Sequence, residues 1–179
     1  LAIANSQDGI MYLDQEIRNF VLNKSNKNIE TIMLLISIPG TPFGILATTL
    51  SLSACAFLRF NWKSSLVPLS IVPLVAINET IKQFIGRPRP SDPLIFGFPS
   101  SHAFETILVM GFIWFIFNNK DKSNKTTNKI MIGIMILWCL TVGISRIYLD
   151  RHWFTDIIGG YALGIPITFL VGLFFKKDK

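Results

Sequence analysis

The chain has 179 residues, of which 50% are hydrophobic and only 16% are charged, and its formal net charge is +6. Its mean hydropathy of +0.47 is too high for a soluble protein of this length, and it excludes intrinsic disorder. A positive charge alone is compatible with nucleic-acid binding, but the 17 Lys and Arg residues lie between long apolar runs and form no basic face. We therefore expect a single membrane domain over residues 1–179 that binds no nucleic acid.

The first segment of the chain has the spacing of an amphipathic helix over residues 8–22. Its apolar stripe consists of Ile10, Leu13, Ile17, Phe20 and Val21, and the polar positions off that stripe are Asp14, Glu16 and Arg18. Since residues 1–30 contain no apolar run long enough to cross a bilayer, we expect this helix to lie in the outer membrane interface. It either packs there or forms a lid over a lateral entry.

Five apolar segments follow, each about as long as the roughly 20 residues that cross a bilayer. Residues 31–58 carry no charge, and Pro39, Gly40 and Pro42 predict either a bend or the start of the helix at that point. The other four segments are residues 64–85, 100–117, 130–149 and 157–175. Because helices this uniformly apolar have no polar face for water, we predict an all-α, polytopic bundle of five spanning helices over residues 31–175.

Five spans put the chain ends on opposite sides and sort the loops by charge. One side receives the basic residues Arg59, Lys63, Lys120, Lys122, Lys125, Lys129, Lys176, Lys177 and Lys179. By the positive-inside rule this side is cytoplasmic, and residues 176–179 are a basic cytoplasmic tail. The extracytoplasmic side receives residues 1–30, the loop at 86–99 and the short connection at 149–153. These positions predict a multi-pass protein of the cytoplasmic membrane.

The polar residues that do not suit a membrane gather at the outward connections of this bundle. The cations are Lys82, Arg89 and Arg146, joined by the hydroxyls of Ser100 and Ser101 and by the amides of a helix start. Each cation alone has an ordinary explanation, because Lys and Arg at helix ends snorkel to lipid head groups. Together they are the donors that bind a tetrahedral oxyanion, and phosphate fits them best.

The chain contains only two histidines, and both lie at the same outward connections. Asp156 follows His152 by one helical turn, so its carboxylate can fix the tautomer of the ring. The other ring nitrogen then faces the anion as a nucleophile or base. His102 comes from a different helix and is free to act as the acid.

Two nearby acids are expected to support these groups. Glu79 precedes Lys82 by three positions, which predicts an ion pair that lowers the cost of holding a lysine at membrane depth. Glu105 follows His102 by three positions, and it either accepts a hydrogen bond from that ring and keeps it protonated, or is an ordinary polar residue of the helix without such a role.

These residues resemble the three-part signature of the type-2 phosphatidic acid phosphatase superfamily, K-x6-RP, PSGH and SR-x5-H-x3-D. The matching residues are Lys82, Arg89, Pro90, Pro99, Ser100, Ser101, His102, Ser145, Arg146, His152 and Asp156. The resemblance is to the bacterial membrane branch that acts on lipid phosphates. It implies an all-helical enzyme, usually with six spans, that hydrolyses a lipid phosphate or diphosphate without a metal or other cofactor.

The resemblance also implies a role for each residue. His152 attacks phosphorus and forms a phosphohistidine, Asp156 orients it, and His102 protonates the leaving group. The phosphoryl oxygens are held by Lys82, Arg89, Ser100, Arg146 and the backbone amide of Ser101.

Two features depart from the family pattern. Ser101 replaces the Gly of PSGH, which adds strain if this position needs a positive φ. Five spans are visible where six are usual, and residues 1–4 read as the tail of a missing one.

Undecaprenyl diphosphate and phosphatidylglycerophosphate are the favoured substrates, with lipid A and phosphatidic acid as alternatives. A soluble acid phosphatase or a vanadium haloperoxidase is disfavoured because the motifs lie between spanning segments.

A different class of function would be an anion-binding membrane sensor or transporter without turnover. Binding alone needs no oriented nucleophile, so His152, Asp156 and His102 together favour the enzyme. We expect no obligate protein partner beyond the lipid substrate and the bilayer.

Overall fold

The computed structural model describes residues 2–118 and 125–174, with side chains from residue 9 onward. The helices are α1 (Ala2–Leu22), α2 (Lys27–Ser37), the 3-10 helix η1 (Ile38–Gly40), α3 (Pro42–Arg59), α4 (Trp62–Leu69), α5 (Ile71–Ile85), α6 (Ser101–Phe117), α7 (Lys125–Tyr148) and α8 (Phe154–Gly172). Within these ranges the only β-pairing is an isolated bridge between Pro88 and Phe96. The all-α prediction is confirmed.

The helices form a polytopic membrane bundle, as predicted. In the described part of the chain, four segments are long and apolar enough to cross a bilayer, namely Pro42–Arg59, Trp62–Ile85, Lys125–Tyr148 and Phe154–Gly172. The remaining apolar helix, α6, has 17 residues. At about 1.5 Å per residue it is about 26 Å long, slightly less than the roughly 30 Å hydrocarbon core. The predicted number of five spans is therefore approximate.

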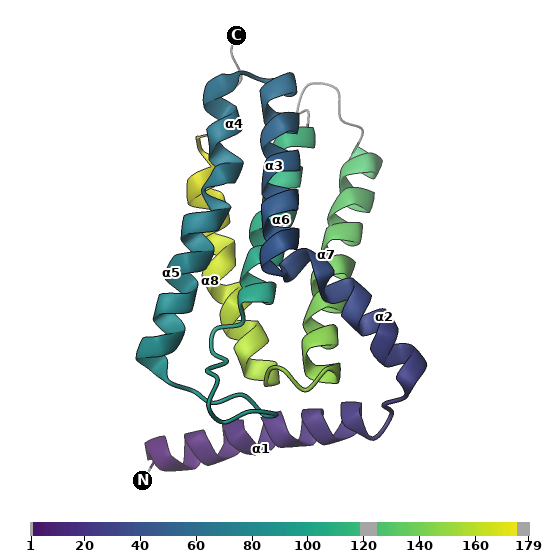
Figure 1. The fold of residues 1–179 in the computed structure, drawn as a ribbon, viewed down its shortest axis with the longest axis vertical. Helices are drawn as coiled ribbons and strands as arrows, with labels where there is room; N and C mark the ends of the chain where they lie inside the picture. The colour runs from purple at the N-terminus through teal and green to yellow at the C-terminus, as the bar shows by residue number, and fades with distance from the viewer. Residues whose placement is uncertain (1, 119–124, 175–179) are drawn as a thin grey trace.

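The prediction of one spanning helix that starts at residue 31 is wrong. α2 ends at Ser37, and η1, which contains Pro39, leads into α3. The Thr41 side chain accepts a hydrogen bond from Gly44 N at 3.1 Å, and Pro42 occupies the first turn of α3. A side-chain cap followed by proline starts a new helix, so the alternative prediction, a start at this point, is confirmed. α2 runs obliquely to the bundle and packs against α7 (Figure 1).

α6 is the central helix of the bundle. Its residues Phe104, Leu108, Phe112 and Ile116 are buried in one apolar cluster with residues of α3, α4 and α5. Its most extensive contact is with α8, which approaches through Gly160. A Cβ at Gly160 would lie 2.6 Å from the Ser100 carbonyl oxygen, so only glycine permits this distance. This contact brings the start of α6 against the start of α8.

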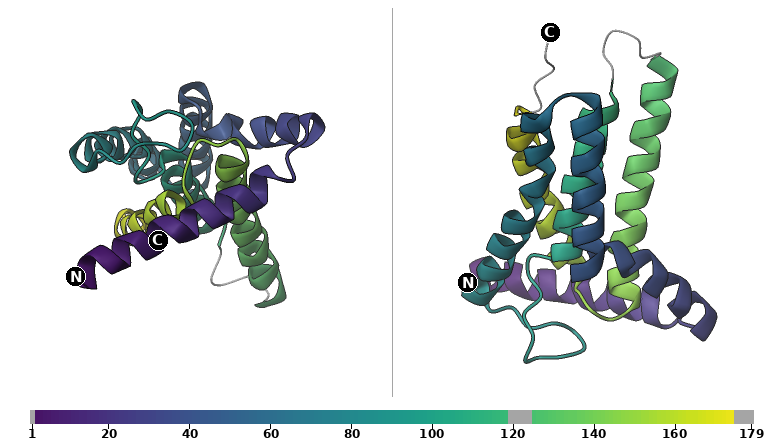
Figure 2. Two further views of the ribbon diagram at one scale, coloured as in Figure 1. Left: turned by 90° about the horizontal axis from the view of Figure 1, so that it is seen from below. Right: turned by 45° about the horizontal axis from the view of Figure 1, so that its top comes forward.

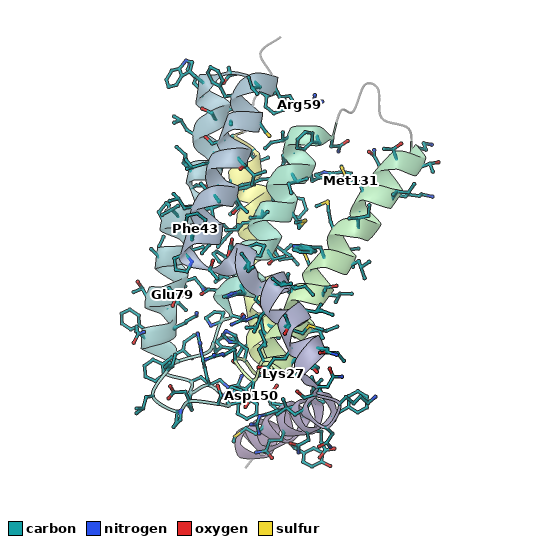
Figure 3. All side chains as sticks on the ribbon, turned by 45° about the vertical axis from the view of Figure 1, so that its right-hand side comes forward. Lys27, Phe43, Arg59, Glu79, Met131 and Asp150 are labelled. Atoms are coloured by element: carbon teal, nitrogen blue, oxygen red, sulfur yellow. The ribbon has the colours of Figure 1, made fainter. Side chains whose placement is uncertain are left out.

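The polar connections and the basic ends lie at opposite ends of the bundle. Figure 3 shows Arg59 at one end and Glu79 and Asp150 toward the other. The α3–α4 connection, the start of α7 and the end of α8 share the Arg59 end (Figure 1). This separation agrees with the predicted sorting of loops, although which end is cytoplasmic stays a prediction. Lys120, Lys122 and the predicted tail at 176–179 lie outside the described residues.

α1 crosses the polar end of the bundle nearly perpendicular to the other helices (Figure 2). Ile10, Leu13 and Phe20 are exposed, whereas Ile17 and Val21 pack against a small buried cluster formed by residues of α6, α7 and α8. The expected apolar stripe is thus mostly on the outside. The polar positions Asp14 and Arg18 face the bundle instead.

Candidate active site

The site begins where α5 ends. Gly86 takes a left-handed conformation (φ 66°) that terminates α5, and the chain then forms a loop up to α6. Gly97 N donates to the Arg87 carbonyl at 2.7 Å, and Arg89 N donates to the Ile95 carbonyl at 2.9 Å. These backbone bonds fold the loop onto itself, so that the Arg89 side chain is held near the starts of α6 and α8.

His152 and Asp156 are buried together beside the start of α8. Their exposed fractions are 2% and 0%. His152 Nδ1 lies 3.3 Å from Asp156 Oδ2, the carboxylate oxygen that also accepts a hydrogen bond from Trp153 N at 3.1 Å. Ser100 N donates to the Asp156 carbonyl at 2.9 Å, which joins the second and third motifs. The predicted contact between the two side chains is present.

The electrostatic surroundings of His152 keep its ring neutral. Burial lowers the pKa of His152 well below its usual 6.5, and the charges of Arg89, Arg146 and Lys82 lower it further. These three cations come from the loop after α5, from α7 and from α5 itself. The cations that the sequence predicts around this histidine therefore do surround it.

Cations and apolar walls share one cavity of about 560 Å³ between α3, α5 and α6. Its polar end is lined by Glu79, Lys82, Arg89, Ser101 and His102, and its apolar walls by Ile45, Leu46, Val72, Val75 and Ala76. No residue of α1 from residue 9 onward lines this cavity. The alternative that α1 is a lid over a lateral entry is therefore not supported here.

Two buried donors of the site have no partner within the described protein, namely Ser100 Oγ and Arg146 Nε. Ser100 is fully buried and Arg146 is 7% exposed. Leaving such a donor unpaired costs about 1–3 kcal/mol. Both are therefore available to the oxygen atoms of an anion.

Glu79 connects Lys82 to the start of α6. Its Oε1 accepts from Lys82 Nζ at 2.9 Å and from Ser101 Oγ, and Asn78 Nδ2 donates to Ser101 Oγ at 2.8 Å. The predicted ion pair between Glu79 and Lys82 is present. Ser101 begins α6 and does not have a positive φ, so the expected strain at this position is absent.

The alternative in which Glu105 accepts a hydrogen bond from the His102 ring is wrong. Its Oε2 atom is buried without a hydrogen-bond partner, and no hydrogen bond joins Glu105 to His102. The neighbour of the His102 ring is Gly40 of η1, where a Cβ would lie 2.3 Å from His102 Cδ2. Because Gly40 has no side chain, the His102 imidazole can occupy this position without a steric clash.

Sequence reasoning assigned no role to three residues that contact the His152–Asp156 pair or its neighbour. Arg87 Nη1 donates to Asp156 Oδ1 at 2.7 Å and to Thr155 Oγ1 at 2.6 Å, and Arg87 Nη2 donates to Asp14 at 2.5 Å. Arg87 lies between Lys82 and Arg89 in the first motif, so its position in the sequence could have identified it as a residue of the site. Nothing in the local pattern pairs Asp14 with Thr155 or Arg87, because those contacts join distant segments.

The fold and the site define a multi-pass helical membrane protein whose polar end gathers three cations around an oriented histidine. The chain belongs to the PAP2 superfamily, whose family model matches residues 63–179. The resemblance seen in the three motifs is thereby confirmed.

Individual relatives agree with this membership. Phosphatidylglycerophosphatase B of Bacillus subtilis is 34% identical over 129 residues, which are 69% of this chain and 63% of that protein. Undecaprenyl-diphosphatase of Sulfolobus acidocaldarius is 29% identical over 140 residues, 78% of this chain and 59% of that protein. The chain thus spans less than two thirds of the length of either relative.

A solved structure shares the fold over almost the whole chain. The crystal structure of a transmembrane PAP2 type phosphatidylglycerolphosphate phosphatase from Bacillus subtilis matches with a TM-score of 0.80 at 28% identity. The match covers 96% of this chain and 88% of that one.

Proposed function

We propose that this protein hydrolyses a membrane lipid phosphate or diphosphate, without a metal, through a phosphohistidine on His152. The observation that carries the proposal is the pair of unpartnered buried donors, Ser100 Oγ and Arg146 Nε, beside the buried His152 and Asp156. Ser100 N bonds the Asp156 carbonyl, and His152 N bonds the Arg146 carbonyl at 3.3 Å. A phosphoryl group bound among these residues satisfies both donors and lies in reach of the imidazole.

The first step is attack of His152 Nε2 on phosphorus. The Asp156 carboxylate accepts a hydrogen bond from the protonated Nδ1 of His152, so Nε2 carries the lone pair. The P–N bond forms as the P–O bond to the lipid breaks, and His102 donates a proton to the departing oxygen. Water, deprotonated by His102, then breaks the P–N bond and releases inorganic phosphate.

The cations supply the stabilisation that a metal provides in other phosphotransferases. The transition state spreads negative charge over the equatorial phosphoryl oxygens, and Lys82, Arg89 and Arg146 are fixed donors for them. The depressed pKa of His152 leaves its ring unprotonated and nucleophilic at neutral pH. Independence from metals is itself a prediction, which a chelator tests.

The cavity between α3 and α5 supports a lipid as the substrate. It has cations and His102 at one end and walls of Ile45, Leu46 and Val72 at the other. A phosphate head and a hydrocarbon tail match these two ends. Because relatives are named for phosphatidylglycerophosphate and undecaprenyl diphosphate, these two lipids are our favoured substrates. Lipid A and phosphatidic acid are the alternatives.

We further propose that the site opens on the extracytoplasmic face of the cytoplasmic membrane. The basic residues at the other end of the bundle support this orientation through the positive-inside rule. Arg59, Lys63, Lys125 and Lys129 lie at that end. Protease or thiol labelling of intact cells, with a cysteine introduced at Leu94, tests the orientation.

The activity is tested on purified protein in detergent with EDTA present. The panel consists of phosphatidylglycerophosphate, undecaprenyl diphosphate, phosphatidic acid and lipid A, beside the His152→Ala variant. We expect phosphate release from at least one lipid and a loss of at least about 10³-fold in the variant. Activity that requires a metal, or that survives in the variant, contradicts the mechanism. Binding of the lipids without turnover would favour the sensor or transporter.

A further inference from the structure

The polar face of α1 is buried against the connection that carries His152, and Asp14 is its most enclosed residue. The Asp14 side chain is 1% exposed. Its Oδ1 accepts from Thr155 N at 2.9 Å, and its Oδ2 accepts from Thr155 Oγ1 at 2.6 Å. A buried carboxylate persists only when donors of this kind surround it. Asp14 therefore fastens α1 to the start of α8, 141 positions along the chain.

Arg87 links Asp14 to Asp156. Arg87 Nη2 donates to Asp14 Oδ2 at 2.5 Å, while Nη1 donates to Asp156 Oδ1 at 2.7 Å. The guanidinium is planar and rigid, so its two ends cannot move independently. The position of Nη1 at Asp156 consequently depends on the carboxylate that holds Nη2.

The Asp156 carboxylate is held on both of its oxygens. Oδ1 faces Arg87, and Oδ2 faces both Trp153 N and His152 Nδ1. The distance to Nδ1 is 3.3 Å, so a small rotation of the carboxylate breaks this contact. Arg87 is the side chain that holds Oδ1, and Trp153 N is the backbone donor that holds Oδ2.

We propose that Asp14 is a positioning residue for the reaction: through Arg87 it sets the orientation of Asp156 and hence of the His152 ring. The inference rests on the proposed function, and it assigns to α1 a part in positioning the nucleophile. Asp14 touches neither the substrate nor the reacting atoms. The negative charge of Asp14 also offsets the positive charge of Arg87. Without Asp14, the carboxylate of Asp156 would be the remaining acid that pairs with this guanidinium.

The charge of Asp14 predicts the direction in which the pH dependence of the reaction changes when this residue is replaced. The charged and titratable groups that face His152 or its partner Asp156, directly or through Arg87, are Asp14 on α1, Lys82 and Glu79 on α5, Arg87 and Arg89 on the loop, His102 on α6, Arg146 on α7 and Asp156 itself on α8. Removing the negative charge of Asp14 makes these surroundings more positive. The protonated form of His152 is then less favoured, and the acidic limb of the pH profile of kcat/KM moves to lower pH.

A second anchor of α1 provides a comparison within the same helix. Arg18 donates to Asp150 through Nε at 2.6 Å and Nη2 at 2.7 Å. It packs α1 against the same connection, with its guanidinium 5.9 Å from the Trp153 ring centre, but no bond links it to Asp156. Breaking this anchor loosens α1 but removes neither of the hydrogen bonds by which Arg87 joins Asp14 to Asp156.

The experiment compares four variants of the full chain in detergent, and its substrate is the lipid of the panel above that the wild type hydrolyses fastest. We expect Asp14→Asn to lower kcat about tenfold, with KM changed less than twofold, and to shift the acidic limb down by about half a pH unit. Arg18→Gln lowers the melting temperature but leaves the limb in place. The control is Glu16→Gln, which alters an exposed acid of α1 and matches the wild type.

Thr155→Val is the fourth variant and removes only the hydroxyl between Asp14 and Arg87. It conserves shape and should lower kcat about threefold at constant KM, even if Asp14→Asn fails to fold. An unshifted limb in Asp14→Asn, an equal shift in Arg18→Gln, or a kcat of Thr155→Val equal to wild type overturns the inference. A wild-type protein that releases no phosphate from any lipid contradicts the proposed function instead.

Discussion

The two sides of the site hold their charges in different ways. On the cradle side, which consists of Asn78, Glu79, Lys82, Arg89 and Ser101, the acid and its cation are three residues apart on one helix, and the Glu79 side chain is 52% exposed. On the nucleophile side, which consists of Asp14, Arg87, His152, Thr155 and Asp156, the acid comes from a distant helix and is 1% exposed. Solvent therefore reaches the carboxylate of the first pair and not the carboxylate of the second, so screening weakens the first pair more. We therefore expect changes on the cradle side to alter binding and changes on the nucleophile side to alter the chemical step.

After the loss of the nucleophile itself in His152→Ala, the largest effect is expected from Asp156→Asn on the nucleophile side. An amide at this position donates to His152 Nδ1, so the proton moves to Nε2 and the nucleophilic lone pair is lost. We predict that kcat falls about 10²–10³-fold while KM stays within about threefold. Steady-state kinetics on phosphatidic acid measure both. Glu30→Gln, an exposed acid at the start of α2, is the control, and a change confined to KM would remove Asp156 from the chemical step.

Arg89→Gln is the strongest test of the cradle side. Loss of a charge-assisted bond to the phosphate is expected to raise KM about 10- to 100-fold. Since Arg89 is among the cations that lower the pKa of His152, its removal lets that pKa rise. Activity is then lost at a higher pH as the solution is acidified, the opposite direction from Asp14→Asn.

The pH profile of kcat/KM distinguishes these outcomes. Arg151→Gln removes an exposed arginine next to His152 and serves as the matched control. An acidic limb that moves to lower pH in Arg89→Gln would mean that Arg89 does not act on His152 by its charge.

The smallest effect is expected from Glu79→Gln. Glu79 lines the same cavity as the cations, so its charge opposes an anionic substrate, but its exposure weakens that repulsion. We predict that KM falls about two- to threefold at low salt. At high salt KM is unchanged, because dissolved ions screen the repulsion between Glu79 and the substrate. Gln83→Ala, exposed on the same helix, is the control. A KM that rises tenfold would show instead that Lys82 depends on this ion pair for its position.

Local spacing made part of the site predictable. His152 and Asp156 are four residues apart, and Glu79 and Lys82 are three apart, so helical geometry alone brings each pair together. The apolar runs likewise predicted the bundle, because a lipid-facing helix needs no pattern beyond length and apolarity. These predictions held because each depends on neighbours in the sequence.

Predictions failed where a distant segment supplied the partner. The same three-residue spacing suggested a bond between Glu105 and His102, but the ring lies against Gly40 of a different segment. The sequence placed Asp14 only among the polar positions off an apolar stripe, and its partners are residues 87 and 155. Helical periodicity identifies a polar face but not what covers it. The division of residues 31–58 at Pro39 was visible in the sequence, whereas the oblique direction of α2 was not.

The most direct test of the proposed chemistry is detection of the covalent intermediate. The full chain is incubated with phosphatidic acid labelled on phosphorus, in EDTA, quenched in alkali to preserve acid-labile phosphohistidine, and mapped by mass spectrometry. We expect one phosphoryl group on His152, absent from His152→Ala and retained at a reduced rate of formation in Asp14→Asn. Phosphate release without any phosphohistidine, or label on another residue, would contradict the mechanism.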